Sequence, residues 1–183
     1  IAIIIMMVLG LHLAYIIVRR KGKLANFLDT LAMFPYVIPG SVIGIGMVLA
    51  FNVKPLVLTG TATIMIVAYT IRKLPFTLRS SIGTLYQIEP AIEEASISLG
   101  EPPMRTFFKT TALLMLPGML SGAVLSFVAT INELSSTIIL YSGGTSTISA
   151  AIYTTLFADA YGPAAALSTI LTASTILALV LFN

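Results

Sequence analysis

Long apolar segments separated by short polar ones dominate this chain of 183 residues. The apolar segments cover residues 1–18, 30–51, 56–71, 111–131 and 164–182. Each is close to the length of about 20 residues that a helix needs to cross a bilayer. The runs are unbroken and do not alternate with polar positions, as the strands of a membrane barrel would. The pattern therefore predicts an all-α polytopic membrane protein with about five transmembrane helices.

Composition and charge placement agree with this prediction. Charged residues make up 9% of the chain and the mean hydropathy is +1.02, whereas a soluble domain carries about a quarter charged residues. Basic residues follow the first apolar segment (Arg19, Arg20, Lys21, Lys23) and the third (Arg72, Lys73). The positive-inside rule places both of these segment ends in the cytoplasm and leaves only Lys54 outside.

The residues that most enzymes and metal sites need are missing from this sequence. It has no cysteine and one histidine, and it lacks phosphate-binding, nucleophile-elbow and HExxH motifs. We therefore expect no catalytic activity and no bound metal. No charged residue falls in the middle of a predicted span, so we expect a partner to supply the driving force. Both ends of the chain are apolar, and residues 1–183 are expected to be one transmembrane domain from a longer protein.

The second apolar segment contains residues that interrupt helices. Pro35 and Pro39 each remove a backbone hydrogen bond, so the helix should bend or break near Pro39. Gly40 and Gly44 are spaced so that another helix can approach closely. This segment is either a hinge that lines a pathway or an ordinary close-packed helix.

Residues 73–110 form the most polar part of the chain. Leu74-Pro75 is expected to break the helix before an amphipathic stretch over residues 76–87. Pro90 suits the first turn of a short helix, and Gly100 suits the left-handed position that ends it. A second short helix is expected over residues 104–110. The segment is thus predicted to be a cytoplasmic helix–turn–helix, with a solvated loop on the membrane surface as the alternative.

Three motifs in this sequence resemble those of one transporter family. Glu94-Ala95-Ser96, three residues and then Gly100 resemble the EAA motif of type I ABC importer permeases. Leu116-Pro117-Gly118 and the stretch from Ile38 to Gly46 match further patterns of these subunits, although the I-x-L-P part is absent at residues 110–113. The chain is therefore similar to the inner membrane component of a binding-protein-dependent transport system, a multi-pass protein of the bacterial inner membrane.

This resemblance implies a role for the polar segment and a set of partners. The segment would dock on cytoplasmic ATP-binding subunits, which would hold ATP and Mg²⁺, while this chain would bind no cofactor. A second permease half, as a homodimer or a fused repeat, and an extracytoplasmic substrate-binding protein are also implied; nucleic acid is not. The coupling residues would be Glu93, Glu94, Ala95, Ser96, Gly100, Arg105, Phe107 and Phe108.

The substrate is indicated by the segment after the fourth predicted span. Residues 132–141 resemble the outer-mouth loop of permeases for ferric iron, and Fe³⁺ prefers oxygen ligands. Alternatively, these side chains contact a binding protein or cap helices. Related subgroups carry aminoalkylphosphonate, thiamine, sulfate or polyamines, and a different class would be an ATP-independent secondary transporter or channel. The candidate outer-mouth contacts are Glu133, Tyr141, Tyr153 and Asp159.

Overall fold

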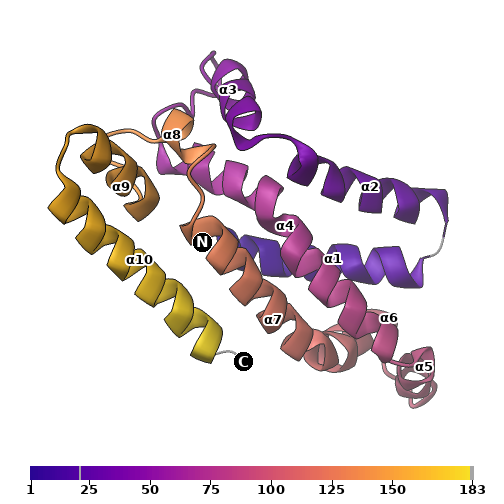
Figure 1. Cartoon of the computed structure of the whole chain (residues 1–183). Helices are drawn as coiled ribbons and strands as arrows, with labels where there is room; N and C mark the ends of the chain where they lie inside the picture. The colour runs from indigo at the N-terminus through magenta and orange to yellow at the C-terminus, as the bar shows by residue number, and fades with distance from the viewer. Residues whose placement is uncertain (21, 182–183) are drawn as a thin grey trace.

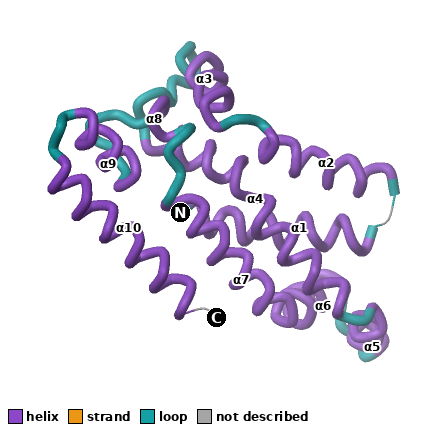
Figure 2. Tube along the Cα trace, in the orientation of Figure 1, coloured by secondary structure: helices purple, strands orange, loops and turns teal. Residues whose placement is uncertain are grey.

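The computed structural model describes residues 1–20 and 22–181, and every regular element in that part is helical (Figures 1 and 2). The all-α prediction is confirmed. The elements are α1 (Ala2–Arg19), α2 (Lys23–Val37), α3 (Gly40–Ala50), α4 (Ala62–Gln87), α5 (Pro90–Ser98), α6 (Pro103–Thr106), the π-helical turn η1 (Phe107–Thr111), α7 (Ala112–Ile131), α8 (Thr137–Leu140), α9 (Ile148–Phe157) and α10 (Tyr161–Leu181).

Three of the described helices are long and apolar enough to cross a membrane: α1, the continuous stretch Pro103–Ile131, and α10. The pair α2 and α3 adds a fourth when counted as one bent span. Helix α4 has 26 residues, about 39 Å at 1.5 Å per residue, which is also long enough to cross. Its charged residues make it less apolar than the others, so hydropathy alone does not identify it as a span.

Helix α4 is the centre of the bundle, with α1 and α7 packed along it (Figure 1). Small residues bring the backbones close, as is common between membrane helices. A Cβ added to Gly122 of α7 would lie 2.7 Å from the Cα of Thr77, and one added to Gly10 of α1 would lie 3.0 Å from its Cγ2. The Thr77 hydroxyl also lies 2.7 Å from that of Ser126. Because the close approach of the helices lets these hydroxyls bond to each other, they can be buried inside the apolar bundle.

The predicted end of the third span at Arg72 and the predicted break at Leu74-Pro75 are wrong. Helix α4 runs unbroken from Ala62 to Gln87 with Pro75 buried inside it. A proline costs one hydrogen bond, and here contacts with neighbouring helices along both sides of α4 outweigh that cost. The polar segment that leaves the bundle consequently begins near Ile88 and not at residue 73.

The second predicted span begins earlier than expected and breaks where expected. Helix α2 starts at Lys23, so Asp29 is not a helix cap; it pairs with Arg79 at 3.0 Å. The chain leaves the helix at Ile38, and α3 begins after Pro39 at an angle of 104° to α2. Pro35 lies inside α2 without ending it. The bend near Pro39 is therefore confirmed.

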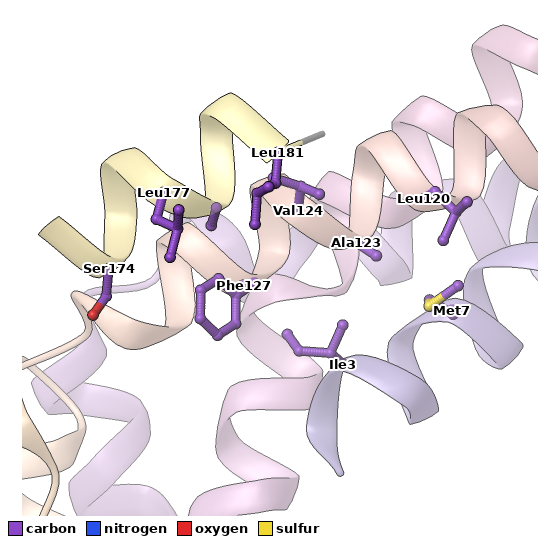
Figure 3. A pocket seen from close by; sticks show the side chains of 10 residues that line it. Ile3, Met7, Leu120, Ala123, Val124, Phe127, Ser174, Leu177 and Leu181 are labelled. Atoms are coloured by element: carbon purple, nitrogen blue, oxygen red, sulfur yellow. The ribbon is translucent and has the colours of Figure 1, made fainter. Parts of the chain in front are cut away.

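The C-terminal helices lie beside the bundle. The Thr147 side chain caps α9 by accepting a hydrogen bond from the Ala150 N–H at 3.2 Å. Helix α10 begins at Tyr161 instead of residue 164, while the predicted end at Phe182 lies outside the described residues. An apolar groove of about 510 Å³ lies between α10, α7 and α1, with Ser174 as its one hydroxyl (Figure 3). Its lining offers polar solutes almost nothing to bind.

Candidate functional site: the α5–α6 coupling segment and the α3–α4–α8 cluster

Helices α5 and α6 project together from one end of the bundle (Figure 1). The predicted helix, glycine turn and second helix are all present. The second arm is not a separate helix over residues 104–110, because α6 passes through the π turn η1 directly into α7. A force applied to α6 would therefore act on a helix that continues into the bundle.

Gly100 makes the turn between the two arms. Its φ is +93°, a left-handed conformation that a residue with a Cβ rarely adopts. Its N–H donates to the Ile97 carbonyl at 2.9 Å, and the Glu101 N–H donates to the Ser96 carbonyl at 3.2 Å. These two bonds form a Schellman motif at the end of α5. The sequence-based assignment of Gly100 as the turn residue is confirmed.

The start of α5 is held to α1 by a charged side chain. Arg19 donates from Nε to Glu93 Oε1 at 2.9 Å and from Nη2 to the Ile88 carbonyl at 3.0 Å. Tyr15 donates its hydroxyl to the other oxygen of Glu93 at 3.1 Å. The Arg19 and Glu93 side chains are only 15% and 12% exposed. Glu93 is thus an internal brace of this segment and not part of an outward docking face.

The two phenylalanines of the motif region have different environments. Phe107 is 6% exposed and packs against Tyr15, with ring centroids 4.7 Å apart, so the prediction that it inserts into a partner is wrong. Phe108 is 52% exposed. His12 lies 5.6 Å from the Phe107 ring, and its Nδ1 is 2.7 Å from the Val8 carbonyl of its own helix. This agrees with a packing role for His12.

The remaining motif residues face outward or join the two arms. Glu94 and Ala95 are exposed. The Ser96 hydroxyl lies 3.0 Å from that of Thr106 and links α5 to α6, and Arg105 pairs with Glu101 at 3.4 Å. Several apolar side chains of the segment are exposed as well. They are Ile92, Ile97, Leu99, Met104 and Phe108.

Three charged side chains meet inside the bundle, against the expectation that no span contains any. Glu133 lies 2.6 Å from Arg72 Nη1 and 2.5 Å from Lys73 Nζ. The sequence placed Arg72 and Lys73 in the cytoplasm and Glu133 outside, and these two placements cannot both hold for side chains in contact. The cytoplasmic placement of Arg72 and Lys73 is wrong, because both lie inside α4. Arg72 and Lys73 lie in the interior of α4, roughly 22 Å along the helix from Gln87 at 1.5 Å per residue. The sequence analysis took these two charges as the end of a span because their partner, Glu133, is distant in the chain.

Two glycines of the bent segment lie against this cluster and the α8 helix beside it. A Cβ on Gly40 would lie 2.6 Å from Arg72 Nη1, and one on Gly44 would lie 3.1 Å from the Cβ of Ile139. The small residues therefore let α3 approach α4 and α8, as their spacing predicted. The sequence signal for the charge cluster was available, because Tyr69, Arg72 and Lys73 share one helical face at i, i+3 and i+4.

The four outer-mouth candidates differ in availability. Both oxygens of Glu133 are engaged by Arg72, Lys73 and the Ser136 N–H, so this carboxylate is not open to a metal ion. Tyr141 is half-buried, Tyr153 packs on Phe157 with centroids 4.5 Å apart, and Asp159 accepts from Tyr161 at 3.2 Å. Within residues 1–20 and 22–181, no three His, Asp or Glu side chains are grouped to hold a metal.

Comparison with known proteins identifies what this arrangement is similar to. The family model described as binding-protein-dependent transport system inner membrane component matches residues 6–183. The ferric transport system permease protein FbpB of Actinobacillus pleuropneumoniae is 35% identical over 88% of this chain and 24% of its own length. The putative 2-aminoethylphosphonate transport system permease protein PhnV of Salmonella typhimurium is 30% identical over 90% of this chain and 62% of its own length.

One solved structure has the same fold across the whole chain. It is a bacterial alginate ABC transporter in complex with its alginate pentasaccharide-bound periplasmic protein, with a TM-score of 0.73 and 18% identity over 100% of this chain and 75% of that one. At this identity the likeness concerns the fold alone. The present chain spans about a quarter of the length of the FbpB relative.

Proposed function

Because this chain belongs to the family of binding-protein-dependent transport system inner membrane components, we propose that it forms the pathway of an ATP-driven importer. It is a membrane permease component and not a catalytic subunit. The observation that carries the proposal is the α5–Gly100–α6 segment at one end of the bundle, with Glu94 outward and Glu93 braced to α1.

The geometry of this segment suits the transmission of force. Its outer surface presents Glu94 and exposed apolar side chains, among them Leu99 and Met104. An exposed ion pair contributes only about 0–1 kcal/mol, so apolar contact would supply most of the binding energy. On the inner side, Arg19 and η1 join the segment to α1 and α7. A movement of the segment would thus reach two helices that flank α4.

The proposed assembly has three kinds of partner. Cytoplasmic subunits would bind ATP and Mg²⁺ and dock on the α5–α6 segment. A second permease half, either another copy or a fused repeat, would complete the pathway, and an extracytoplasmic protein would deliver the substrate. The alginate transporter with the same fold is described with a bound periplasmic protein, which supports the last of these. No cofactor is assigned to this chain.

Ferric iron is the substrate that we propose. The support is the similarity to two ferric transport permeases, at 35% and 37% identity over most of this chain. Because Glu133 already pairs with Arg72 and Lys73, its carboxylate would not coordinate the ion during transport. Aminoalkylphosphonate, thiamine, sulfate and polyamines are the alternatives within the same importer class.

An ATP-independent secondary transporter or channel is the alternative class. A secondary transporter commonly carries ionisable residues inside the membrane, and Arg72, Lys73 and Glu133 are such residues in this chain. Two observations favour the ATP-driven importer over this alternative class. They are the family membership of the chain and the α5–α6 segment, which a channel would not need.

The test is uptake by the complete importer, reconstituted in liposomes with its ATPase and its binding protein. The proposal predicts accumulation of radioactive iron that needs both ATP and the binding protein, while 2-aminoethylphosphonate, thiamine, sulfate and spermidine are not taken up. Uptake of another of these solutes under the same requirements would retain the importer and replace the substrate. Solute flux without ATP would contradict the importer itself.

A further inference from the structure

The buried charges Arg72, Lys73 and Glu133 have no part in the coupling segment. Glu133 is 7% exposed, and the Arg72 and Lys73 side chains are 12% and 13% exposed. Apolar residues of similar volume would hold the helices at least as firmly, because burying a charged pair costs much of what the pair regains. The stability of the bundle alone therefore does not account for burying these three charged side chains in it.

The cluster fastens one segment of chain to α4. Tyr69, Arg72 and Lys73 lie on one face of α4, and each contacts the segment that follows α7. The Tyr69 hydroxyl is 2.6 Å from the Thr137 hydroxyl, while Arg72 and Lys73 hold Glu133. These contacts fix residues 132–140, which we call the outer segment, against the helix.

The bent span packs against the same place. A Cβ on Gly40, at the start of α3, would lie 2.7 Å from the Cβ of Ser135 as well as 2.6 Å from Arg72. Helices α3 and α8 lie together in Figure 1, at the other end of the bundle from α5 and α6. The cluster thus joins three parts that a change of pathway shape would have to separate: the bent span, α4 and the outer segment.

The cluster is also incompletely satisfied. It contains two cations and one carboxylate, and Arg72 Nε has no hydrogen-bond partner among the described residues. A buried donor without a partner destabilises the arrangement that contains it. Opening this cluster to water therefore costs less than opening a fully satisfied network or an apolar core would.

We propose that Glu133 is a positioning residue for transport and that, with Arg72 and Lys73, it forms a charge latch. The latch holds the outer segment against α3 and α4 and is pulled apart when the helices move during the nucleotide cycle. The proposal rests on the importer function proposed above, because it needs a cycle that opens and closes the outer segment. Replacement of Glu133 removes the only negative partner that either cation has within the described residues.

The test uses spheroplasts that express the complete importer with Leu140→Cys. Leu140 ends α8, is 2% exposed, and would be the only cysteine of this chain. Glu133→Gln should raise the rate at which a membrane-impermeant maleimide labels this cysteine at least about tenfold. Removing one partner of a buried ion pair shifts the equilibrium between the closed and the open outer segment by more than about a factor of ten. Glu133→Asp keeps the charge and should restore most of the protection.

Asp29→Asn is the matched control, because Asp29 also pairs with an arginine of α4, at a site where that arginine, Arg79, is 51% exposed. It should leave labelling unchanged. Equal labelling of parent and Glu133→Gln, or equal increases in Glu133→Gln and Asp29→Asn, would overturn the latch. Labelling needs no ATP or substrate, so its outcome is separate from failure of the importer proposal, which uptake reports.

If Glu133→Gln does not fold, the latch is tested instead with the triple variant Arg72→Met, Lys73→Met, Glu133→Leu. Apolar replacement of a whole buried charge cluster is commonly tolerated. This variant should keep Leu140→Cys protected and lose at least about nine-tenths of ATP-driven uptake, because apolar contacts replace a latch that can open to water. Uptake at the parental rate in a folded triple variant would overturn the proposal.

Discussion

Arg19 and Glu93 are separated by 74 positions in the chain, and their side chains meet at 2.9 Å at the end of the bundle from which α5 and α6 project. The pair ties the start of α5 to the end of α1. Because the other arm of the segment continues through η1 into α7, the segment is anchored at both ends in the helices that flank α4. This anchoring at both ends is what the coupling role proposed above requires, because a movement of the segment would reach both flanking helices.

The brace predicts a specific effect of Glu93→Gln. The change removes the charge that Arg19 faces and should lower the free energy of local opening of α5 by about 1.5–3 kcal/mol, the range for hydrogen bonds to charged groups. Hydrogen exchange of the α5 amides would measure it, and uptake per ATP hydrolysed should fall. Glu89→Gln is the control, since Glu89 caps α5 without a side-chain hydrogen bond. An unchanged α5 in Glu93→Gln would contradict the brace.

The burial of Phe107 and the exposure of Leu99 predict opposite outcomes for their replacement. Phe107→Ala should destabilise the permease by about 3–5 kcal/mol, as other buried phenylalanines do. Leu99 is 88% exposed, so Leu99→Ser should leave the thermal stability of the permease unchanged. It should weaken ATPase binding by at least about tenfold if this side chain enters a partner pocket.

Thermal unfolding in detergent and titration with the ATPase subunit would separate the two effects. Loss of ATPase binding in Phe107→Ala at full permease stability would show that Phe107 is a docking residue after all.

The close approach of α7 to α4 at Gly122 predicts a stability difference between two glycines. A Cβ on Gly122 would lie within 2.8 Å of Thr77 and Ser80, and part of that contact is backbone, which cannot move away cheaply. Gly122→Ala should therefore destabilise the bundle by about 1–3 kcal/mol. Gly46→Ala, in α3 with nothing within 4 Å, should be neutral or stabilising. Unfolding in mixed detergent compares them, and equal stabilities would refute the packing argument.

The helix–turn–helix geometry of the α5–Gly100–α6 segment could be predicted from sequence because its signals are local. Pro90 marks the start of α5, and Gly100 marks its end; both follow from backbone chemistry that neighbouring helices do not alter. The bend at Pro39 was found for the same reason.

The interior of α4 could not be predicted in this way, because its signals depend on what packs around it. Arg72 and Lys73 read as the end of a span, since charges in an apolar bundle are disfavoured unless a partner meets them. That partner, Glu133, lies 60 positions or more further along the chain. The roles of Phe107 and Glu93 were misassigned similarly: an aromatic and a carboxylate beside a polar turn look exposed until α1 is placed against them.

Gly100→Pro is the sharpest test of the proposal that the α5–Gly100–α6 segment couples ATP hydrolysis to transport. Proline fixes φ near −65°, far from the +93° found here, and removes the N–H that bonds to Ile97. Gly83→Ala is the matched control, since Gly83 also has nothing within 4 Å but lies in a regular helix.

The measurement is ATP-driven, binding-protein-dependent uptake by the reconstituted importer, with ATPase binding recorded in the same preparations. Gly100→Pro should lose at least about nine-tenths of uptake while Gly83→Ala keeps it, because proline abolishes the left-handed turn that sets the angle between the two arms. Uptake and ATPase binding at the control level in Gly100→Pro would contradict the coupling role of this segment.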